Sequence, residues 1–275
     1  MNKTVLITGA SSGIGKAAAI YFAERGWSVA ATMRSPEKES GLRGYKTIKL
    51  FRLDVTDFQS VRASVAEIIA EMGEVDVLVN NAGYGAIGIF EKSAPDDIYN
   101  QFNTNVFGLM QMTRELLPHF KEKRSGVIIN LSSIAGLVTF PMYSVYNSSK
   151  WAVEGFTEGL QFELRQFNIR LKLIEPGAIK TEFHGRSMVS FSNPDISGYG
   201  DYDNRVEAFM KKANDTAPGP EVVAGTIYKA ATDNTWKLRY PSGAQARMVS
   251  VMRRIVPVTF FRYLTGKLMT SGIVR

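Results

Sequence analysis

The chain has 275 residues, 45% of them hydrophobic and 21% charged, which fits one large α/β domain with a sizeable core. With no cysteine and two histidines, it offers no thiol nucleophile or cysteine metal site and little for a histidine metal site. The net charge of +7 suits an anionic ligand, an anionic membrane or nucleic acid. No signal-peptide pattern and no apolar run near the roughly 18 residues of a membrane span occur, so we expect a cytoplasmic protein without a transmembrane segment.

A glycine-rich stretch follows the first predicted strand, Thr4–Ile7. Gly9, Gly13 and Gly15 come next, and apolar periodicity then indicates a helix that ends near Arg25. Glycines between a strand and a helix allow a tight turn and the close approach of a phosphate to the helix amino end. The spacing is G-x-x-x-G-x-G, not G-x-G-x-x-G, and purely structural turn glycines remain the alternative.

A basic residue follows the second predicted strand, Ser28–Thr32, at a place where NAD-binding sites commonly have an acidic residue. An NAD-binding site usually places a carboxylate there, whereas this chain has Thr32-Met-Arg34 and no acid before Glu37. An arginine fork suits a 2′-phosphate, and an acid would repel it. Arg34 therefore favours NADP(H) over NAD(H), with a solvated surface arginine as the alternative.

Two further predicted strands end in polar motifs. Ile48–Leu53 leads into Asp54 and Val55, and Val75–Val79 leads into Asn80-Asn-Ala-Gly83. A long helical pattern then covers about residues 96–123 and contains Asn105 on its apolar face. A buried amide needs partners, so Asn105 is either a site residue or polar glue between helices.

The run Val127–Leu131 predicts a buried parallel strand with Ser132 and Ser133 at its carboxyl end. A helix begins near Ser144, and Tyr146 and Lys150 leave the same face of it. A hydroxyl beside a phenol and an ammonium makes an acid–base site.

Tyr-x-x-x-Lys alone is weak evidence, because the chain holds two other pairs, Tyr45/Lys49 and Tyr263/Lys267. Only Tyr146/Lys150 has a hydroxyl-bearing strand end just upstream. A buried tyrosine and a solvated lysine is the plain reading of the other two pairs.

The last third begins with a predicted strand, Arg170–Ile174, and a Pro176-Gly177 turn. From Phe183 to Asp215 periodicity fades, and apolar side chains without helical period indicate a substrate loop, either a mobile lid or a loop packed on the core.

Residues 221–231 predict a helix and 236–240 a strand. The basic, apolar tail from about 245 to 275 has three readings, in this order: it borders the cleft, pairs subunits, or lies on an anionic membrane.

Alternating strands and helices without a linker predict a doubly wound parallel sheet in a single domain spanning residues 1–275. The motifs, in this order and at this spacing over about residues 3–182, resemble the short-chain dehydrogenase/reductase family. The branch that contains hydroxysteroid and retinol dehydrogenases is the most similar, on Tyr84-Gly85 and on Arg239-Tyr-Pro-Ser-Gly243. The resemblance implies a Rossmann-type sheet of about seven strands.

The resemblance also implies roles for individual residues. The implied catalytic tetrad is Asn105, Ser133, Tyr146 and Lys150; Ser133 is preferred to Ser132 because the family's serine stands thirteen residues before its tyrosine. The implied cofactor-binding residues are Gly9, Ser11, Ser12, Gly13, Ile14, Gly15, Arg34, Asp54, Val55, Asn81, Ala82, Gly83, Tyr146, Lys150, Pro176, Gly177, Ile179 and Thr181. Many NADP-dependent members carry a second basic residue in the glycine loop, where this chain has Ser12.

The expected activity is hydride transfer between NADP(H) and a carbonyl or secondary alcohol, bulky and apolar, in a homodimer or homotetramer that binds no nucleic acid. In the family, the lysine lowers the pKa of the tyrosine. Lowering a phenol pKa from about 10 to about 7 requires roughly 4 kcal/mol, and an ammonium about 4 Å away supplies about that much. Two other classes remain open: a non-catalytic dinucleotide-binding regulator, and a related epimerase or dehydratase.

Overall fold

Seven strands form one parallel sheet in the order β3-β2-β1-β4-β6-β7-β9. The structure is a computed structural model that describes residues 2–181, 188–257, 259–261, 263 and 266–267. The strands are β1 (Thr4–Thr8), β2 (Ser28–Met33), β3 (Ile48–Arg52), β4 (Val77–Asn80), β6 (Gly126–Leu131), β7 (Ile169–Pro176) and β9 (Arg239–Ser242). The predicted doubly wound sheet of about seven strands is confirmed.

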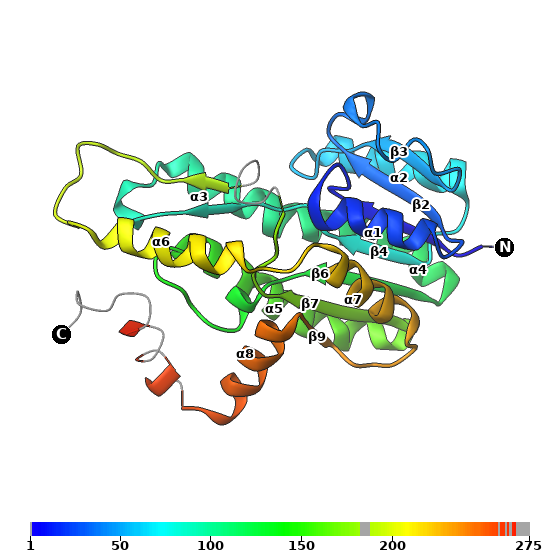
Figure 1. Ribbon diagram of the computed structural model, residues 1–275. Coiled ribbons are helices and arrows are strands. Elements are labelled where there is room, and N and C mark those ends of the chain that lie inside the picture. The colour runs from blue at the N-terminus through cyan, green and yellow to red at the C-terminus, as the bar shows by residue number, and fades with distance from the viewer. Residues whose placement is uncertain (1, 182–187, 258, 262, 264–265, 268–275) are drawn as a thin grey trace.

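Helices cover both faces of the sheet (Figure 1). One face carries α1 (Gly13–Ala23) and α7 (Glu221–Thr232); the other carries α2 (Phe58–Met72), α4 (Leu109–Lys123) and α5 (Ser144–Leu164). In β1, Val5 and Ile7 pack toward α1 and α7, while Leu6 packs toward α2 and α4. Both sets are fully buried, which explains why the strand is an unbroken apolar run and not an alternating one.

Local signals set several helix ends. The Asp57 side chain accepts hydrogen bonds from the amides of Gln59 and Ser60 and so caps α2, which Gly73 ends at a φ of 73°. After α1, Gly26 takes a φ of 77°, and Trp27 N–H donates to the Phe22 carbonyl, a Schellman-type ending. These caps fix where the chain enters and leaves each helix.

Two expected elements differ from the structure. The helical pattern of residues 96–123 is broken into α3 (Pro95–Phe102), a π-helical turn (Asn103–Gly108) and α4. The extra residue of the π turn preserves the apolar face, so periodicity alone does not reveal the break. The strand expected at 236–240 begins only at Arg239, because residues 235–237 form a turn around Asp233 and leave Trp236 exposed.

The expectation that residues 183–215 lack helical period is wrong. This segment contains β8 (Met188–Ser190) and α6 (Tyr202–Asp215), while Phe183 lies outside the described residues. Tyr202, Val206 and Met210 do recur at helical spacing, but charged residues between them hide the pattern. Strand β8 pairs with β5 (Gly85–Ile87), a second short strand that the sequence did not indicate.

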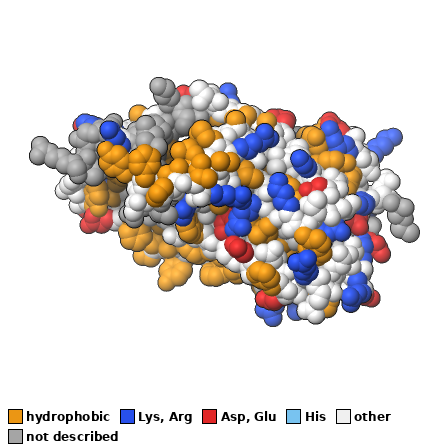
Figure 2. Space-filling view, turned by 90° about the horizontal axis from the view of Figure 1, so that it is seen from below, with side chains coloured by type: hydrophobic (Ala, Val, Ile, Leu, Met, Phe, Trp, Pro, Cys, Tyr) orange, Lys and Arg blue, Asp and Glu red, His pale blue; other side chains and the backbone are white. Residues whose placement is uncertain are grey.

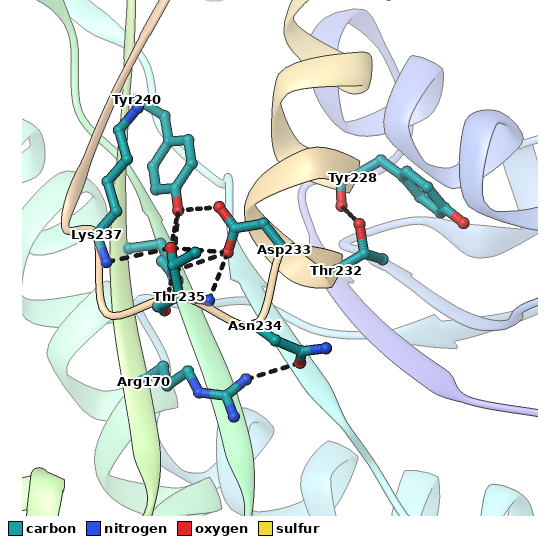
Figure 3. A network of polar contacts seen from close by, with 9 residues as sticks. Arg170, Tyr228, Thr232, Asp233, Asn234, Thr235, Lys237 and Tyr240 are labelled. Carbon is teal, nitrogen blue, oxygen red and sulfur yellow. Dashed lines mark hydrogen bonds and ion pairs between the residues drawn. The ribbon is translucent and has the colours of Figure 1, made fainter.

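A buried lysine fixes the last strand beside β7. Lys172 of β7 is 0% exposed, and its Nζ donates to the Thr235 carbonyl at 2.6 Å and to the Tyr240 hydroxyl at 2.9 Å. It also contacts Asp233 Oδ1 at 3.2 Å, and Figure 3 shows Asp233 and Thr235 meeting the hydroxyl of Tyr240. This network sets the register of β9 and thereby the position of Arg239.

Candidate active site

A cleft of about 750 Å³ lies at the carboxyl ends of the central strands. The sheet order reverses between β1 and β4, and ligands of doubly wound sheets bind at such a switch point. One part of the cleft is lined by the turn after β1, and the other by Ser133, Tyr146 and Lys150. The predicted glycine motif and the predicted acid–base group therefore share one cavity.

The glycines permit close packing at the first part of the cleft. Gly9 has a φ of 67°, and a Cβ there would lie 2.9 Å from the Ala82 Cα. A Cβ on Gly15 would collide with the Asn81 side chain and the Gly9 carbonyl. Gly13 begins α1 with a φ of 53°, so the amino end of a helix opens onto the cleft, as an anionic phosphate requires.

The charges beside this part also fit a dinucleotide. Arg34 lines the cleft at the end of β2, where its side chain is exposed. Glu37 is exposed and does not line the described cleft; Glu39 is buried and held by Lys16 Nζ at 2.6 Å. Asp54 is the one carboxylate among the described lining residues, and it accepts hydrogen bonds from the backbone and hydroxyl of Thr56.

One strand and one helix bring the acid–base group together. Ser133 follows β6 with extended backbone, while Tyr146 and Lys150 stand one turn apart on α5. Lys150 Nζ donates to the Leu131 carbonyl at 2.8 Å and lies 5.7 Å from the centre of the Tyr146 ring. Tyr146 and Lys150 are 9% and 7% exposed, so both polar groups lie on a part of the cleft floor that is nearly closed to solvent.

Burial dominates the titration of this group. It raises the pKa of Tyr146 to about 12, against a hydrogen bond with Ser133 that lowers it. Burial lowers the pKa of Lys150 to about 8, against attraction from Glu154. The direction for Tyr146 is opposite to the lowering expected from the sequence, because desolvation outweighs an ammonium at this distance. Tyr146 is thus a protonated phenol and Lys150 a cation at neutral pH.

Asn105 lies outside the cleft lining and holds structure together. Its Nδ2 donates to the Tyr84 carbonyl at 2.9 Å and to Ser149 Oγ at 3.3 Å, and its Oδ1 accepts from the Tyr84 amide at 3.0 Å. The side chain therefore links the π turn to the start of β5 and to α5. These contacts match the alternative interpretation of Asn105, a polar side chain that joins packed elements by hydrogen bonds.

All but two of the predicted site residues line the cleft. The exceptions are Asn105 and Gly15, both of which lie directly behind it. The other two Tyr-x-x-x-Lys pairs lie elsewhere: Lys49 pairs with Glu71 at 3.2 Å, and Tyr263 is 63% exposed.

The sequence did not single out two lining residues on the acid–base side, Phe140 and Tyr143. Tyr143 had a usable signal, since it precedes Tyr146 by three residues, and the two rings meet edge-on at 6.0 Å. Val189, Met210 and Gln245 also line the cleft and come from segments that the sequence placed near it only as ranges. The Oε1 of Gln245 accepts from the Ala178 amide.

Segments from the last third of the chain border the acid–base side. Phe191 is 7% exposed and packs on Ala86 and Val145, and Lys92 Nζ contacts Asp203 Oδ2 of α6 at 3.0 Å. The first turns of α8 (Ala244–Ile255) pack on Ile134 and Val138. The start of the tail therefore borders the cleft, which was the first of the three readings.

The outer face of α8 is apolar and basic. Met248, Val251 and Ile255 are 58%, 57% and 74% exposed. Figure 2 shows hydrophobic side chains with Lys and Arg among them toward the end of the molecule that carries the C-terminal segment. No helix among the described residues has the length and hydrophobicity to cross a membrane, and those residues hold no cluster of three metal-ligating side chains.

Curated relatives align with 71% to 98% of the chain. An uncharacterized oxidoreductase of Bacillus subtilis, YusZ, is 38% identical over 98% of this chain and 100% of its own length. The 3-ketodihydrosphingosine reductase of Bacteroides thetaiotaomicron is 37% identical over 82% of both chains. Human retinol dehydrogenase 8 is 40% identical over 71% of this chain and 65% of its own.

Solved structures share the fold. A short-chain dehydrogenase from Streptomyces avermitilis has a TM-score of 0.84 at 31% identity and covers 98% of this chain and 97% of its own. ElxO with NADP bound has a TM-score of 0.73 at 32% identity, covering 86% and 95%. A Burkholderia phymatum relative in complex with NAD has a TM-score of 0.78 at 25% identity, covering 93% and 94%.

A family model described as short chain dehydrogenase matches residues 3–188, which include the glycine turn, Ser133, Tyr146 and Lys150. The cleft that these residues line fits a nicotinamide dinucleotide, and solved relatives carry NADP or NAD. The chain therefore belongs to the short-chain dehydrogenase/reductase family of oxidoreductases.

Proposed function

We propose that the protein is an NADP(H)-dependent carbonyl reductase or alcohol dehydrogenase acting on a bulky apolar substrate. The observation that carries this proposal is the meeting of Ser133, Tyr146 and Lys150 on the floor of the cleft that also holds the glycine turn and Arg34. The bound dinucleotide supplies or accepts the hydride. The protein side chains bind it and move the proton.

Tyr146 is the proton donor in the reductive direction. Its phenol is protonated at neutral pH because burial raises its pKa to about 12, which suits donation to a carbonyl oxygen. Ser133 contributes a hydroxyl that hydrogen-bonds the same oxygen. Lys150, cationic below about pH 8, stabilises the phenolate that remains after the proton has left.

Asn105 acts indirectly in this scheme. It holds Tyr84 and Ser149, and Ser149 Oγ in turn donates to the Tyr146 carbonyl at 2.8 Å. The family resemblance implies that Asn105 positions a water connecting Lys150 to solvent, and that role stays a prediction. The contacts named here support a positioning role through the backbone of α5.

The NADP preference is supported by Arg34 and by the lack of a lining carboxylate on the β2 side among the described residues. Phe140, Tyr143 and Met210 give the acid–base side an apolar wall, which suits a bulky apolar ketone. The names of two relatives, a 3-ketodihydrosphingosine reductase and a retinol dehydrogenase, agree with such a substrate.

The test is loss of NADPH absorbance with a panel of carbonyl compounds that includes long-chain 3-keto compounds and retinal-like aldehydes. We expect turnover with bulky apolar members and faster turnover with NADPH than with NADH. Tight NADPH binding without turnover on any member would favour the dinucleotide-binding regulator. Turnover of an alcohol without net change in the dinucleotide would favour an epimerase or dehydratase.

A further inference from the structure

A cluster of buried charges lies behind the floor of the cleft, outside the residues assigned above. Glu154 of α5 and Glu175 of β7 are 6% and 0% exposed. Arg239 of β9 lies between them, with Nη2 3.0 Å from Glu154 Oε2 and Nε 3.3 Å from Glu175 Oε1. The same Nη2 lies 3.0 Å from Glu158 Oε2, on a side chain that is 55% exposed. Two buried carboxylates therefore share one guanidinium.

Glu154 is placed to act on Lys150. It follows Lys150 by four residues, so both side chains leave the same face of α5. They reach consecutive residues at the end of β6, since Lys150 donates to the Leu131 carbonyl and Glu154 lies against Ser132. A Cβ on Gly136 would lie 2.6 Å from Ser132 Oγ and 2.9 Å from Glu154 Cγ, so a glycine is needed to leave room there.

Lys150 lacks a directly paired carboxylate among the described residues. It is 7% exposed, and no carboxylate oxygen in that part of the chain lies within 4 Å of its Nζ. A buried ammonium loses its proton unless negative charge is near. Burial lowers the pKa of Lys150 to about 8, and Glu154 acts in the opposite direction.

Hydrogen bonding and attraction favour the charged form of Glu154. Burial raises the pKa of Glu154, whereas Ser132 and Arg239 lower it. Burial and repulsion from Glu154 raise the pKa of Glu175 to about 8. Ser132 and Arg239 thus support an anionic Glu154 on the helix that carries Lys150.

The other titratable and charged groups around this pair come from every element packed on it. They are Tyr143 before α5, Tyr146 and Glu158 on α5, Glu175 on β7, Lys237 and Arg239 at β9, and Arg254 on α8. The cations among them cannot serve as a counter-charge to an ammonium, and Glu154 is the carboxylate of this set whose attraction acts on Lys150.

We propose that Glu154 is a positioning residue that keeps the catalytic Lys150 cationic, and that Arg239 holds Glu154 in place from the neighbouring strand. The inference rests on the proposed function in that Lys150 serves Tyr146. The plainer reading is that Glu154 and Arg239 only join α5 to β9. If that explanation is right, removing the Glu154 carboxylate leaves the titration of Lys150 unchanged.

The test is the titration midpoint of Lys150 in the full-length protein, followed by NMR with isotope-labelled lysine and assigned by the signal lost in Lys150→Met. Glu154→Gln removes the charge and keeps the shape. We expect its midpoint to fall by about one pH unit, because removing a nearby opposite charge removes an attraction that favours the ammonium. Glu158→Gln is the matched control, since it breaks a contact with the same guanidinium nitrogen from an exposed position, and its midpoint should stay at the wild-type value.

A midpoint in Glu154→Gln equal to that of wild type would overturn the inference. If the glutamine variant does not fold, Glu154→Met has nearly the same volume without an amide to satisfy, and the same criterion applies. With a reducible ketone in hand, the alkaline limb of kcat should move to lower pH in Glu154→Gln and stay in place in Glu158→Gln. The NMR titration needs no substrate. If the wild-type protein turns over no substrate, the proposed function is contradicted, but the NMR titration still decides whether Glu154 keeps Lys150 cationic.

Discussion

Tyr146 lies at the floor of the cleft with its ring packed on Tyr143. A phenylalanine ring can keep this packing, so the hydroxyl can be removed without disturbing the core. Tyr146→Phe should lower kcat by about 10²–10⁴ while NADPH binding stays nearly intact, because only the proton donor is lost. Steady-state kinetics and fluorescence titration with NADPH measure the two quantities.

Two other tyrosines provide controls. Tyr45 packs against the core near β3 and Tyr263 is exposed, and neither lines the cleft. Tyr45→Phe and Tyr263→Phe should retain wild-type kcat. More than about a tenth of wild-type kcat in Tyr146→Phe would show that another group donates the proton.

The proposed preference for NADP(H) rests on Arg34, which is exposed and lines the cleft after β2. Arg34→Asp removes a charge-assisted contact worth about 1.5–3 kcal/mol and adds repulsion toward a 2′-phosphate. The ratio of kcat/KM for NADPH to that for NADH should fall by about tenfold or more. An unchanged ratio would identify Arg34 as a surface charge without contact to the cofactor.

At the scale of elements, the described contacts that tie α6 and β8 to the body of the protein include a short strand pairing and an ion pair. Strand β8 pairs with β5 over three residues, and Lys92–Asp203 at 3.0 Å joins α6 to the turn before α3. Val189 and Met210 from these elements line the cleft. We therefore keep the prediction that this segment closes over a bulky substrate and excludes water.

Limited proteolysis measures that closure. NADPH together with a bound ketone should slow cleavage within residues 188–215 several-fold relative to the empty enzyme. Asp203→Asn, which removes the anchor of α6, should speed cleavage in the empty enzyme. Equal rates with and without ligands would mean that the segment is packed permanently on the core.

The elements that the sequence predicted well are those whose signals are local. Alternation of buried strands with amphipathic helices is encoded within each segment, so β1, β6 and the start of α5 were predicted within a few residues. The π turn around Asn105 escaped because an inserted residue keeps the apolar stripe nearly continuous. Helix α6 escaped because its apolar positions are sparse and separated by charges.

Within the site, residue types were predictable but the environment of each group was not. The motif places a phenol and an ammonium on one helical face, yet the balance between burial and attraction depends on contacts far apart in the chain. Arg239 and Glu175, which come from two other strands, surround Glu154 beside Lys150. No spacing rule in the sequence reports that meeting. The sequence does not report the depth of burial of Tyr146 either, and burial is why its pKa is raised where a lowering was expected.

At the scale of the whole molecule, the buried carboxyl of Glu175 makes stability depend on pH. Its pKa is about 8 in the folded protein and near 4.5 when exposed. A carboxyl with a raised pKa contributes stability that is fully present below about pH 4.5 and is lost as the pH rises through 8, because the unfolded chain releases the proton first. This group alone should lower the free energy of unfolding by at most about 1.4 kcal/mol per pH unit in that window.

Glu175→Gln removes this titration while keeping the shape of the side chain. The difference in unfolding free energy between the glutamine variant and wild type should therefore grow in favour of the variant from pH 5 to pH 8, as measured by urea denaturation at several pH values. Glu158→Gln should run nearly parallel to wild type, because Glu158 is largely exposed and its ion pair is screened. Parallel curves for Glu175→Gln as well would mean that Arg239 keeps Glu175 ionised in the folded protein, and that both buried carboxylates, not Glu154 alone, stand charged behind Lys150.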